Sequence, residues 1–279
     1  MTTLWAIYSF LVGACFGSFL NVCISRWPDG LSVVRPRSRC PKCERQITAA
    51  ENIPVFSWIA LRGRCRGCRN PISFQYPLVE ILVGLVWMFS YLNYGLSFTG
   101  ARVAMLVTVL LGIAITDAKR YLIPDGFTVF GLIWVIVTAL IALFLADPGP
   151  FAGAYDAILG ACAGAGAIAI AGWLGEVILK ALGREETEAM GFGDVTLMAV
   201  VGAAVGPDRA LMTIFLGAVL ATVVFIPLVV PLAWMRAKQK GVPFEKPLVP
   251  FGVFLAPAAV IALLWGDRLI AAYTSYSGL

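Results

Sequence analysis

The sequence contains no histidine, and only 13% of its 279 residues are charged. The absence of histidine excludes Ser–His and Cys–His nucleophilic catalysis, and it excludes every histidine-based metal site. A glycine-rich phosphate loop ending in Gly-Lys-Ser/Thr is also missing. Any chemistry in this chain must therefore come from carboxylates, thiols or the backbone.

Apolar residues dominate the chain, at 60% hydrophobic composition and a mean hydropathy of +0.87. Crossing a bilayer takes roughly 20 consecutive apolar residues. The pattern predicts an all-α polytopic membrane protein with about eight transmembrane helices, of which the sixth is short. The predicted spans are 4–25, 78–95, 100–117, 127–146, 157–180, 194–206, 209–235 and 250–272. Pairs of glycines four residues apart, Gly13/Gly17 and Gly160/Gly164, suit close packing between such helices.

Positive charge is distributed unevenly along the chain. The connections 26–76, 118–126, 180–193 and 236–249 together hold 18 of the 21 Lys and Arg residues. The positive-inside rule therefore predicts that these connections are cytoplasmic and that both termini are periplasmic. Membrane topology therefore explains the net charge of +5, which does not indicate a nucleic-acid partner. The basic loop 26–76 is expected to lie against anionic lipid headgroups.

Three parts follow from this organisation. Residues 1–25 form a first transmembrane helix, and they do not resemble a cleaved signal peptide because no basic segment precedes the apolar run. Residues 26–76 form a small cytoplasmic loop domain between helices 1 and 2. Residues 77–279 form the remaining transmembrane core.

Four cysteines lie in the 26–76 loop as two pairs, "CPKC" and "CRGC", which are Cys40, Cys43, Cys65 and Cys68. Two C-x2-C pairs that are separated by 21 residues are typical of a tetrahedral four-sulfur zinc site. Two disulfides or a redox couple are the alternatives, but stable disulfides are unusual in the cytosol. A structural zinc ion would supply folding energy that a loop of this size cannot obtain by burial.

Two aspartates, Asp117 and Asp194, lie at predicted membrane boundaries on the same side of the bilayer. Acids near membrane spans are costly and are usually functional. If the two carboxylates meet, they should share one proton. One member can then accept a proton from water while the other protonates a carbonyl oxygen, which is acid–base hydrolysis of an amide. Gly191 and Gly193 would let the backbone bend and let a substrate strand approach.

Ordinary structural roles are also open to these acids. Asp194 can cap the helix that follows it. Asp117 can pair with Lys119 or Arg120 at the end of a helix, and Asp125 can belong to the turn "PDG".

Several stretches together resemble the type IV prepilin peptidases, which are membrane aspartic proteases of the GxGD type. They follow the family's order along nearly the whole chain. The stretches are "GSFLNVCISRWP" (17–28), "ENIPVFSWIALRGRCRGC" (51–68), "PISFQYPLVE" (71–80), "DAKRYLIPD" (117–125), "MGFGDVTLMA" (190–199) and "PFGVFLAPAA" (250–259).

The resemblance implies that Asp194 is the aspartate of the GxGD motif and that Asp117 is its catalytic partner. It also implies cleavage of the basic leader of prepilins or type II secretion pseudopilins at the cytoplasmic face of the bacterial inner membrane. In many members the same enzyme then methylates the new N-terminal amine with S-adenosylmethionine, and the cysteine loop is characteristic of those members. This chain has Thr196 where the family usually has lysine.

Glu185, Glu186 and Glu188 precede the GxGD motif and form an acidic approach to Asp194. They are either a solvated helix end or a patch that attracts a basic leader. Three other functions compete with the bifunctional enzyme: a peptidase without methylation, a proton-coupled transporter that uses Glu176 with the two aspartates, and a non-catalytic zinc scaffold. Glu51 and Glu80 are candidate acids for a methyl-donor site.

Overall fold

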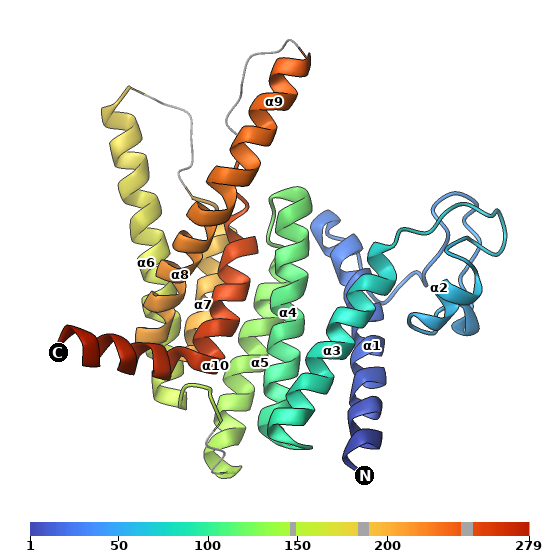
Figure 1. Ribbon diagram of the computed structural model, residues 1–279, viewed down its shortest axis with the longest axis horizontal. Coiled ribbons are helices and arrows are strands. Elements are labelled where there is room, and N and C mark those ends of the chain that lie inside the picture. Colours follow the sequence, from blue (N-terminus) through green and yellow to red (C-terminus); the bar gives the residue numbers. More distant parts are fainter. Residues whose placement is uncertain (146–148, 184–189, 241–247, 279) are drawn as a thin grey trace. The chain divides into compact units, whose positions relative to one another are not determined.

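The computed structural model describes residues 1–145, 149–183, 190–240 and 248–278 (Figure 1). The chain divides into two compact units, Met1–Gly112 and Ile113–Leu279. Within the described residues the regular structure is helical, apart from two isolated antiparallel bridges in the cysteine loop, Arg39–Gln46 and Arg64–Pro71.

The prediction of an all-helical membrane protein is confirmed. In the described part of the chain, seven helical segments are long and apolar enough to span a bilayer, and one shorter apolar helix accompanies them. The long segments are α1 (Thr2–Arg26), α3 (Gln75–Tyr94), α4 (Phe98–Arg120), α5 (Asp125–Leu145), α6 (Ala154–Ala181), the continuous run from α8 (Pro207–Val224) into α9 (Val230–Lys240), and α10 (Phe251–Ser277). The shorter helix is α7 (Phe192–Val205), which matches the short sixth span.

In the first unit, α1 packs closely along α3. A Cβ atom added to Gly17 would lie 2.7 Å from the Glu80 Cα, and one added to Gly13 would lie 2.6 Å from the Trp87 Cβ. Small residues therefore allow the two backbones to approach, as the glycine spacing predicted. The short helix α2 (Phe56–Ala60) lies in the loop between them.

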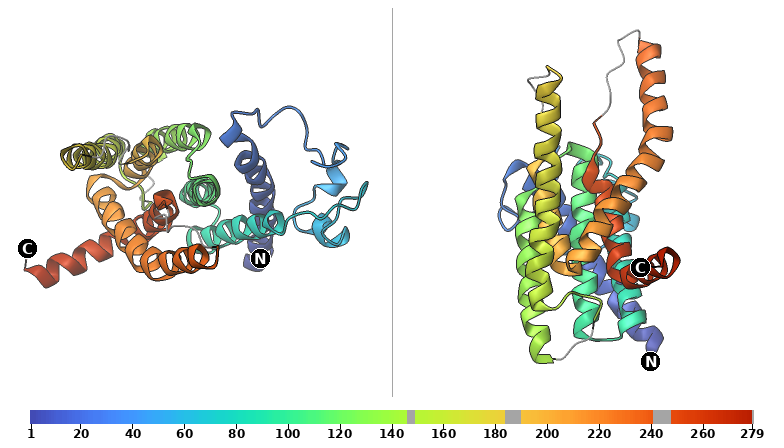
Figure 2. Two further views of the ribbon diagram at one scale, coloured as in Figure 1. Left: turned by 90° about the horizontal axis from the view of Figure 1, so that it is seen from above. Right: turned by 90° about the vertical axis from the view of Figure 1, so that its left-hand side faces the viewer.

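In the second unit, α7 is the central helix and contacts α5, α6, α8 and α10 (Figure 2). Its residues from Val200 to Val205 are all buried. At 14 residues α7 is about 21 Å long, shorter than the roughly 30 Å hydrocarbon core of a bilayer. A helix that neighbours surround on all sides needs no polar face, and this explains its continuous apolar sequence.

The closest backbone contact in the second unit joins α6 to α7. Gly160 and Gly202 face each other so closely that a Cβ atom on either would overlap the carbonyl group of the other. Gly164 similarly faces the Met198 carbonyl. The predicted role of Gly160 and Gly164 in helix packing is thus confirmed, and Gly202 is the partner that sequence spacing did not identify.

Between α8 and α9 the helix widens into a π-helical turn, η3 (Phe225–Val229), which contains Pro227. Proline has no N–H to donate, so it interrupts the regular ladder of backbone hydrogen bonds. Phe225 packs in an apolar cluster with Ala221 and with Phe254 of α10. This cluster fixes the start of α10 against the second half of α8.

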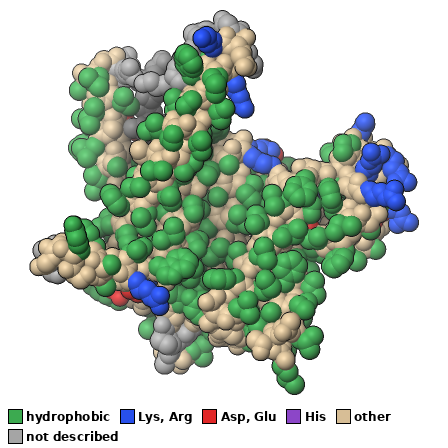
Figure 3. All heavy atoms as spheres, viewed as in Figure 1, with side chains coloured by type: hydrophobic (Ala, Val, Ile, Leu, Met, Phe, Trp, Pro, Cys, Tyr) green, Lys and Arg blue, Asp and Glu red, His purple; other side chains and the backbone are tan. Residues whose placement is uncertain are grey.

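The surface agrees with residence in a membrane. Hydrophobic side chains cover the exposed sides of the helices, whereas Lys and Arg gather on the loop between α1 and α3 (Figure 3). Apolar surface of this extent is stable only in contact with lipid or protein. The chain is therefore a multi-pass membrane protein.

The glycine contact between α6 and α7 yields a test of the fold. Replacing Gly160 by Val should lower the melting temperature in detergent, with a loss of about 1–3 kcal/mol or more, because the new side chain has no space. Gly166 lies on the same helix with no atom within 4 Å of its position for a Cβ. The variant Gly166→Val is the matched control and should melt like the parent. Equal melting temperatures for both variants would contradict this packing.

Candidate active site and candidate metal centre

Asp117 lies in the last turn of α4, and only 6% of its surface is exposed. Its Oδ2 accepts a hydrogen bond of 3.2 Å from the Val253 N–H in the first turn of α10. The first N–H groups of a helix have no partner within the helix, and they carry a partial positive charge. The start of α10 therefore holds the Asp117 carboxylate.

Asp194 lies in the first turn of α7 and is half-buried. The residue at the N-cap of this helix is Gly191, and no side chain caps it. Asp194 is three residues further on, with its N–H bonded to the Gly191 carbonyl at 3.1 Å. The alternative that Asp194 is the helix cap is therefore wrong, and its carboxylate is left for another role.

Ile123 lies where the starts of α7 and α10 meet the end of α4. Directly after α4, Tyr121 adopts a left-handed conformation with φ 52°, which ends the helix in a turn. A Cβ atom on Gly193 would lie 2.9 Å from the Ile123 Cβ. One on Gly252 would lie 3.1 Å from the Ile123 Cδ1 and 3.0 Å from the Asp117 Oδ2. Both glycines therefore allow helix starts to approach the buried acid.

Both acids lie at this junction, because Ile123 lies against Gly193, the neighbour of Asp194, and close to Gly252, which lies beside the Asp117 Oδ2. The two acids come from different helices, and Ile123 at their junction is buried and apolar. Close carboxylates in partly dry surroundings form the acid–base pair that hydrolyses amide bonds in aspartic proteases. The structure thus brings together the two aspartates that the sequence predicted.

The remaining predicted residues differ in position. Asp125 is the first residue of α5 with an exposed side chain, consistent with a structural role at a helix start. Gly191 is exposed beside Asp194. The Thr196 hydroxyl donates to the Gly193 carbonyl at 3.0 Å, so it bonds within its own helix. Glu185, Glu186 and Glu188 lie outside the described residues.

Sequence reasoning assigned no role to Ile123, Gly252 or Val253. The stretch "PFGV" at 250–253 is the signal that could have found the last two, because a glycine just inside a helix start permits close contact. Nothing in the sequence shows that this helix start meets residue 117.

The four loop cysteines converge in the first unit. Their Sγ atoms all lie within 4.8 Å of one another, and the Cys40–Cys68 and Cys43–Cys65 separations are 3.7 and 4.0 Å. Four sulfurs about 2.3 Å from a central zinc ion would be about 3.8 Å apart. All four thiols are free, which argues against the two-disulfide alternative. The geometry fits one tetrahedral metal ion.

The two cysteine pairs share one backbone design. The N–H of Glu44 donates to the Cys40 carbonyl at 2.9 Å, and the N–H of Arg69 donates to the Cys65 carbonyl at 3.0 Å. Glu44 and Arg69 each follow the second cysteine of a pair, and both adopt a left-handed conformation. Each turn folds its two sulfurs toward the same point. The backbone N–H groups of Cys43 and Lys42 lower the pKa of the Cys40 thiol, whereas hydrogen bonds from the neighbouring sulfurs raise the pKa of Cys43, so Cys40 is the member of this pair that is favoured as a thiolate.

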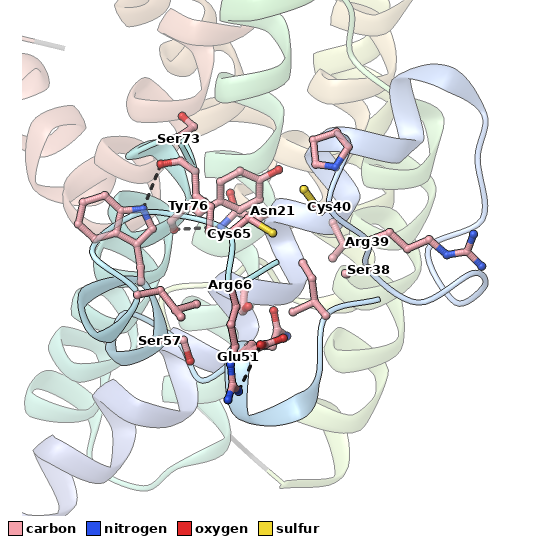
Figure 4. A pocket seen from close by; sticks show the side chains of 18 of the residues that line it. Asn21, Ser38, Arg39, Cys40, Glu51, Ser57, Cys65, Arg66, Ser73 and Tyr76 are labelled. Atoms are coloured by element: carbon pink, nitrogen blue, oxygen red, sulfur yellow. Dashed lines mark hydrogen bonds and ion pairs between the residues drawn. The ribbon is translucent and has the colours of Figure 1, made fainter. Parts of the chain in front are cut away.

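Glu51 forms ion pairs with two arginines that neighbour the cysteine pairs (Figure 4). Its carboxylate accepts two hydrogen bonds from Arg45 Nη2, at 2.9 and 3.1 Å, and lies 3.6 Å from Arg66. The Arg45 guanidinium and the Thr48 N–H lower the pKa of Glu51 to about 2. Glu51 is therefore charged and joins residues beside both cysteine pairs.

The fold and the paired carboxylates define a polytopic membrane peptidase of the aspartic class. Residues 11–94 match the family model described as the bacterial peptidase A24 N-terminal domain, and residues 104–226 match the type IV leader peptidase family. The chain belongs to the prepilin leader peptidase/N-methyltransferase family.

Several curated relatives match over nearly their full lengths. A prepilin leader peptidase/N-methyltransferase of Stutzerimonas stutzeri is 34% identical, covering 99% of this chain and 96% of that protein. Proteins of the same name from Aeromonas hydrophila and Bacillus subtilis are 33% and 29% identical, covering 95% of this chain in both cases and 93% and 96% of those proteins. No solved structure gives a significant match to the chain.

The close contact at Gly252 predicts a specific defect. Gly252→Ala should lower the kcat of peptide cleavage on the order of 10-fold, because the added methyl group displaces the Asp117 carboxylate. Gly166→Ala is the reference variant, since no atom lies within 4 Å of its position for a Cβ on α6. It should have the milder effect in the same assay. A Gly252→Ala enzyme as active as the parent would show that this contact does not position Asp117.

Proposed function

We propose that this protein cleaves the leader peptide from type IV prepilins or type II secretion pseudopilins, with Asp117 and Asp194 as its catalytic pair. The observation that supports the proposal is the arrangement of Asp117 at the end of α4 and Asp194 at the start of α7 around Ile123, with Asp117 bonded to the start of α10. The two relatives from Stutzerimonas stutzeri and Aeromonas hydrophila are named for this activity, and the alignments cover 96% and 93% of those proteins.

The proposed reaction uses one proton shared by the two aspartates. A water oxygen attacks the carbonyl carbon of the scissile amide and gives its proton to the ionised carboxylate, while the other carboxyl group protonates the carbonyl oxygen. The C–N bond then breaks, and the departing nitrogen takes a proton and leaves as an amine. No covalent intermediate forms with the enzyme. Gly191, which is exposed beside Asp194, leaves room for the substrate strand.

The charge distribution supports an orientation in the bacterial inner membrane. With the basic connections in the cytoplasm, both termini are periplasmic and the aspartate pair faces the cytoplasm. A basic leader would arrive on that side. Glu185, Glu186 and Glu188 would attract its Lys and Arg residues, and Asp125 would lie on the same side at the start of α5.

The same protein is proposed to methylate the new N-terminal amine of its product. S-adenosylmethionine would supply the methyl group, and the relatives' names include this second activity. Cys40, Cys43, Cys65 and Cys68 are proposed to hold a structural zinc ion, because their sulfur separations fit its tetrahedral geometry. Four sulfurs fill the coordination of the ion, so it would stabilise the loop without binding substrate.

The aspartate pair is tested by replacement with asparagine. Asp117→Asn and Asp194→Asn should each reduce cleavage of a purified prepilin by several orders of magnitude, since the amide keeps the shape but cannot exchange the proton. Mass spectrometry of the substrate measures the loss of the leader. Asp125→Asn is the control and should be milder. Near-parental cleavage by either of the first two variants would refute the assignment.

The proposed zinc ion is tested by replacing its cysteine ligands and comparing the effects on methylation and on cleavage. Cys40→Ser or Cys68→Ser should release zinc, make the loop sensitive to proteolysis and reduce methylation more than cleavage, because the metal supplies the folding energy of the loop. Cys162→Ser is the matched control, since this cysteine is exposed on α6 outside the cluster. Metal analysis that finds no zinc in the parent protein would remove the premise.

A further inference from the structure

The second part of α10 leaves the helix bundle. Figures 1 and 2 show its final turns, drawn in dark red, running outward across the direction of α5 and α6. All the buried residues of α10 lie between Gly252 and Gly266, and none of the residues from Asp267 to Gly278 is buried. We call the segment Asp267–Ser277 the α10 arm.

The length of α10 places the start of this arm near a membrane boundary. From Phe251 to Gly266 the helix is roughly 24 Å long, which is less than the roughly 30 Å hydrocarbon core of a bilayer. Its first turn meets Asp117, which the sequence places at one membrane boundary. The helix therefore reaches the opposite boundary region close to Gly266, where the arm begins.

Arg209 fixes the start of the arm to the end of α7. A Cβ atom on Gly266 would lie 2.7 Å from the Arg209 Cδ, so the aliphatic part of this side chain lies against the backbone of α10. Its Nη1 lies 3.5 Å from the Asp267 Oδ2 and donates to the Pro150 carbonyl at 2.8 Å. Its Nε donates to the carbonyl of Val205, the last residue of α7, at 2.7 Å. The arm is thereby attached to α7 where it leaves the bundle.

The arm has one apolar face and one polar face. Leu269, Tyr273 and Tyr276 are separated by four and three residues, so they lie on the same side of the helix. Their exposed fractions are 42%, 65% and 93%. Arg268 and Ser275 lie on the opposite side by the same helical spacing. The pattern is that of a surface helix, and its apolar side chains have little cover within the described structure.

We propose that the α10 arm lies in the plane of the membrane surface, on the side opposite the aspartate pair, with Leu269, Tyr273 and Tyr276 inserted among the lipids. Amphipathic helices in this position bury their apolar face about 5–10 Å into the boundary between headgroups and acyl chains. Tyrosine is enriched at this level because its ring is apolar and its hydroxyl group is polar. Through Arg209, an arm held at the surface keeps α7 at a fixed depth in the bilayer.

Lipid is the partner that the adjoining surface indicates. Trp265 lies four residues before Leu269, on the same side of the helix, and it is 45% exposed on the part of α10 that belongs to the bundle. The apolar stripe of the arm therefore continues the lipid-facing surface of the bundle without interruption. Asp267 and Arg268 carry opposite charges, so the arm has no net charge and does not require anionic lipid.

Fluorine NMR of the full-length protein in phosphatidylcholine nanodiscs tests the position of the arm. Trifluoromethylphenylalanine is introduced in place of Tyr273 on the apolar face or, as the matched control, in place of Ser275 on the polar face. Relaxation of each label is compared among a water-soluble gadolinium chelate, a lipid with a nitroxide near its headgroup, and a lipid with a nitroxide at the end of its acyl chain.

The two labels should respond to different probes. The label at Tyr273 should be relaxed severalfold more by the nitroxide near the headgroup than by either other probe, and the label at Ser275 should be relaxed most by the chelate. Tyr276 is a second labelling position on the apolar face and should behave like Tyr273. Adding phosphatidylglycerol to the nanodiscs should leave the pattern unchanged, because the arm has no net charge.

Three results would overturn the proposal. Equal relaxation of both labels by the chelate would place the arm in water. Strongest relaxation of both labels by the nitroxide at the end of the acyl chain would make the arm part of a membrane span. A label at Tyr273 that no probe reaches would mean that protein, such as a second copy of the chain, covers this face.

A pair of charge substitutions tests the apolar face directly. Leu269→Glu should increase the relaxation of the Tyr273 label by the chelate severalfold, because a carboxylate is costly to insert among lipids and draws the arm toward water. Arg268→Glu places the same carboxylate on the polar face and should leave this relaxation unchanged. An equal response of the label to the two substitutions would contradict insertion of the face that carries Leu269.

Discussion

A carboxylate among apolar helices requires hydrogen-bond donors, and Asp117 obtains one from a residue 136 positions away. To supply it, the start of α10 must reach the end of α4, which is possible because Gly252 has no side chain. Phe254 then secures this helix start against Phe225 in the π-helical turn. The interruption at Pro227 and the position of the acid are therefore linked through one apolar cluster.

The two activities proposed for this chain have different structural requirements. Peptide hydrolysis needs two carboxylates at a fixed separation, and α7 provides a rigid support because its second half is buried among its neighbours. Methyl transfer needs a site that admits a small polar ligand. The cysteine loop is largely hydrophilic and has little apolar core of its own, so its order depends on ion pairs such as Arg45–Glu51 and would be increased by a metal ion bound to the four cysteines.

The helices, the aspartate pair and the cysteine cluster could all be predicted from the sequence because each has a local signature. Apolar length marks the spans, and the C-x2-C spacing specifies a metal site without knowledge of the fold. The donor to Asp117 could not be found, because no local pattern reports a contact between residues 117 and 253. The same holds for Gly202, which becomes necessary only through its contact with Gly160. Asp194 was open to interpretation as a helix cap until the structure showed Gly191 in that position.

The repeated turn at the two cysteine pairs has a thermodynamic consequence. Each turn supplies only two sulfurs, so neither holds the proposed zinc ion fully, and the ion acts as a cross-link between distant segments of the loop. The stability of the loop then rises with the logarithm of the free zinc concentration, by about 2.7 kcal/mol at 100 times the dissociation constant.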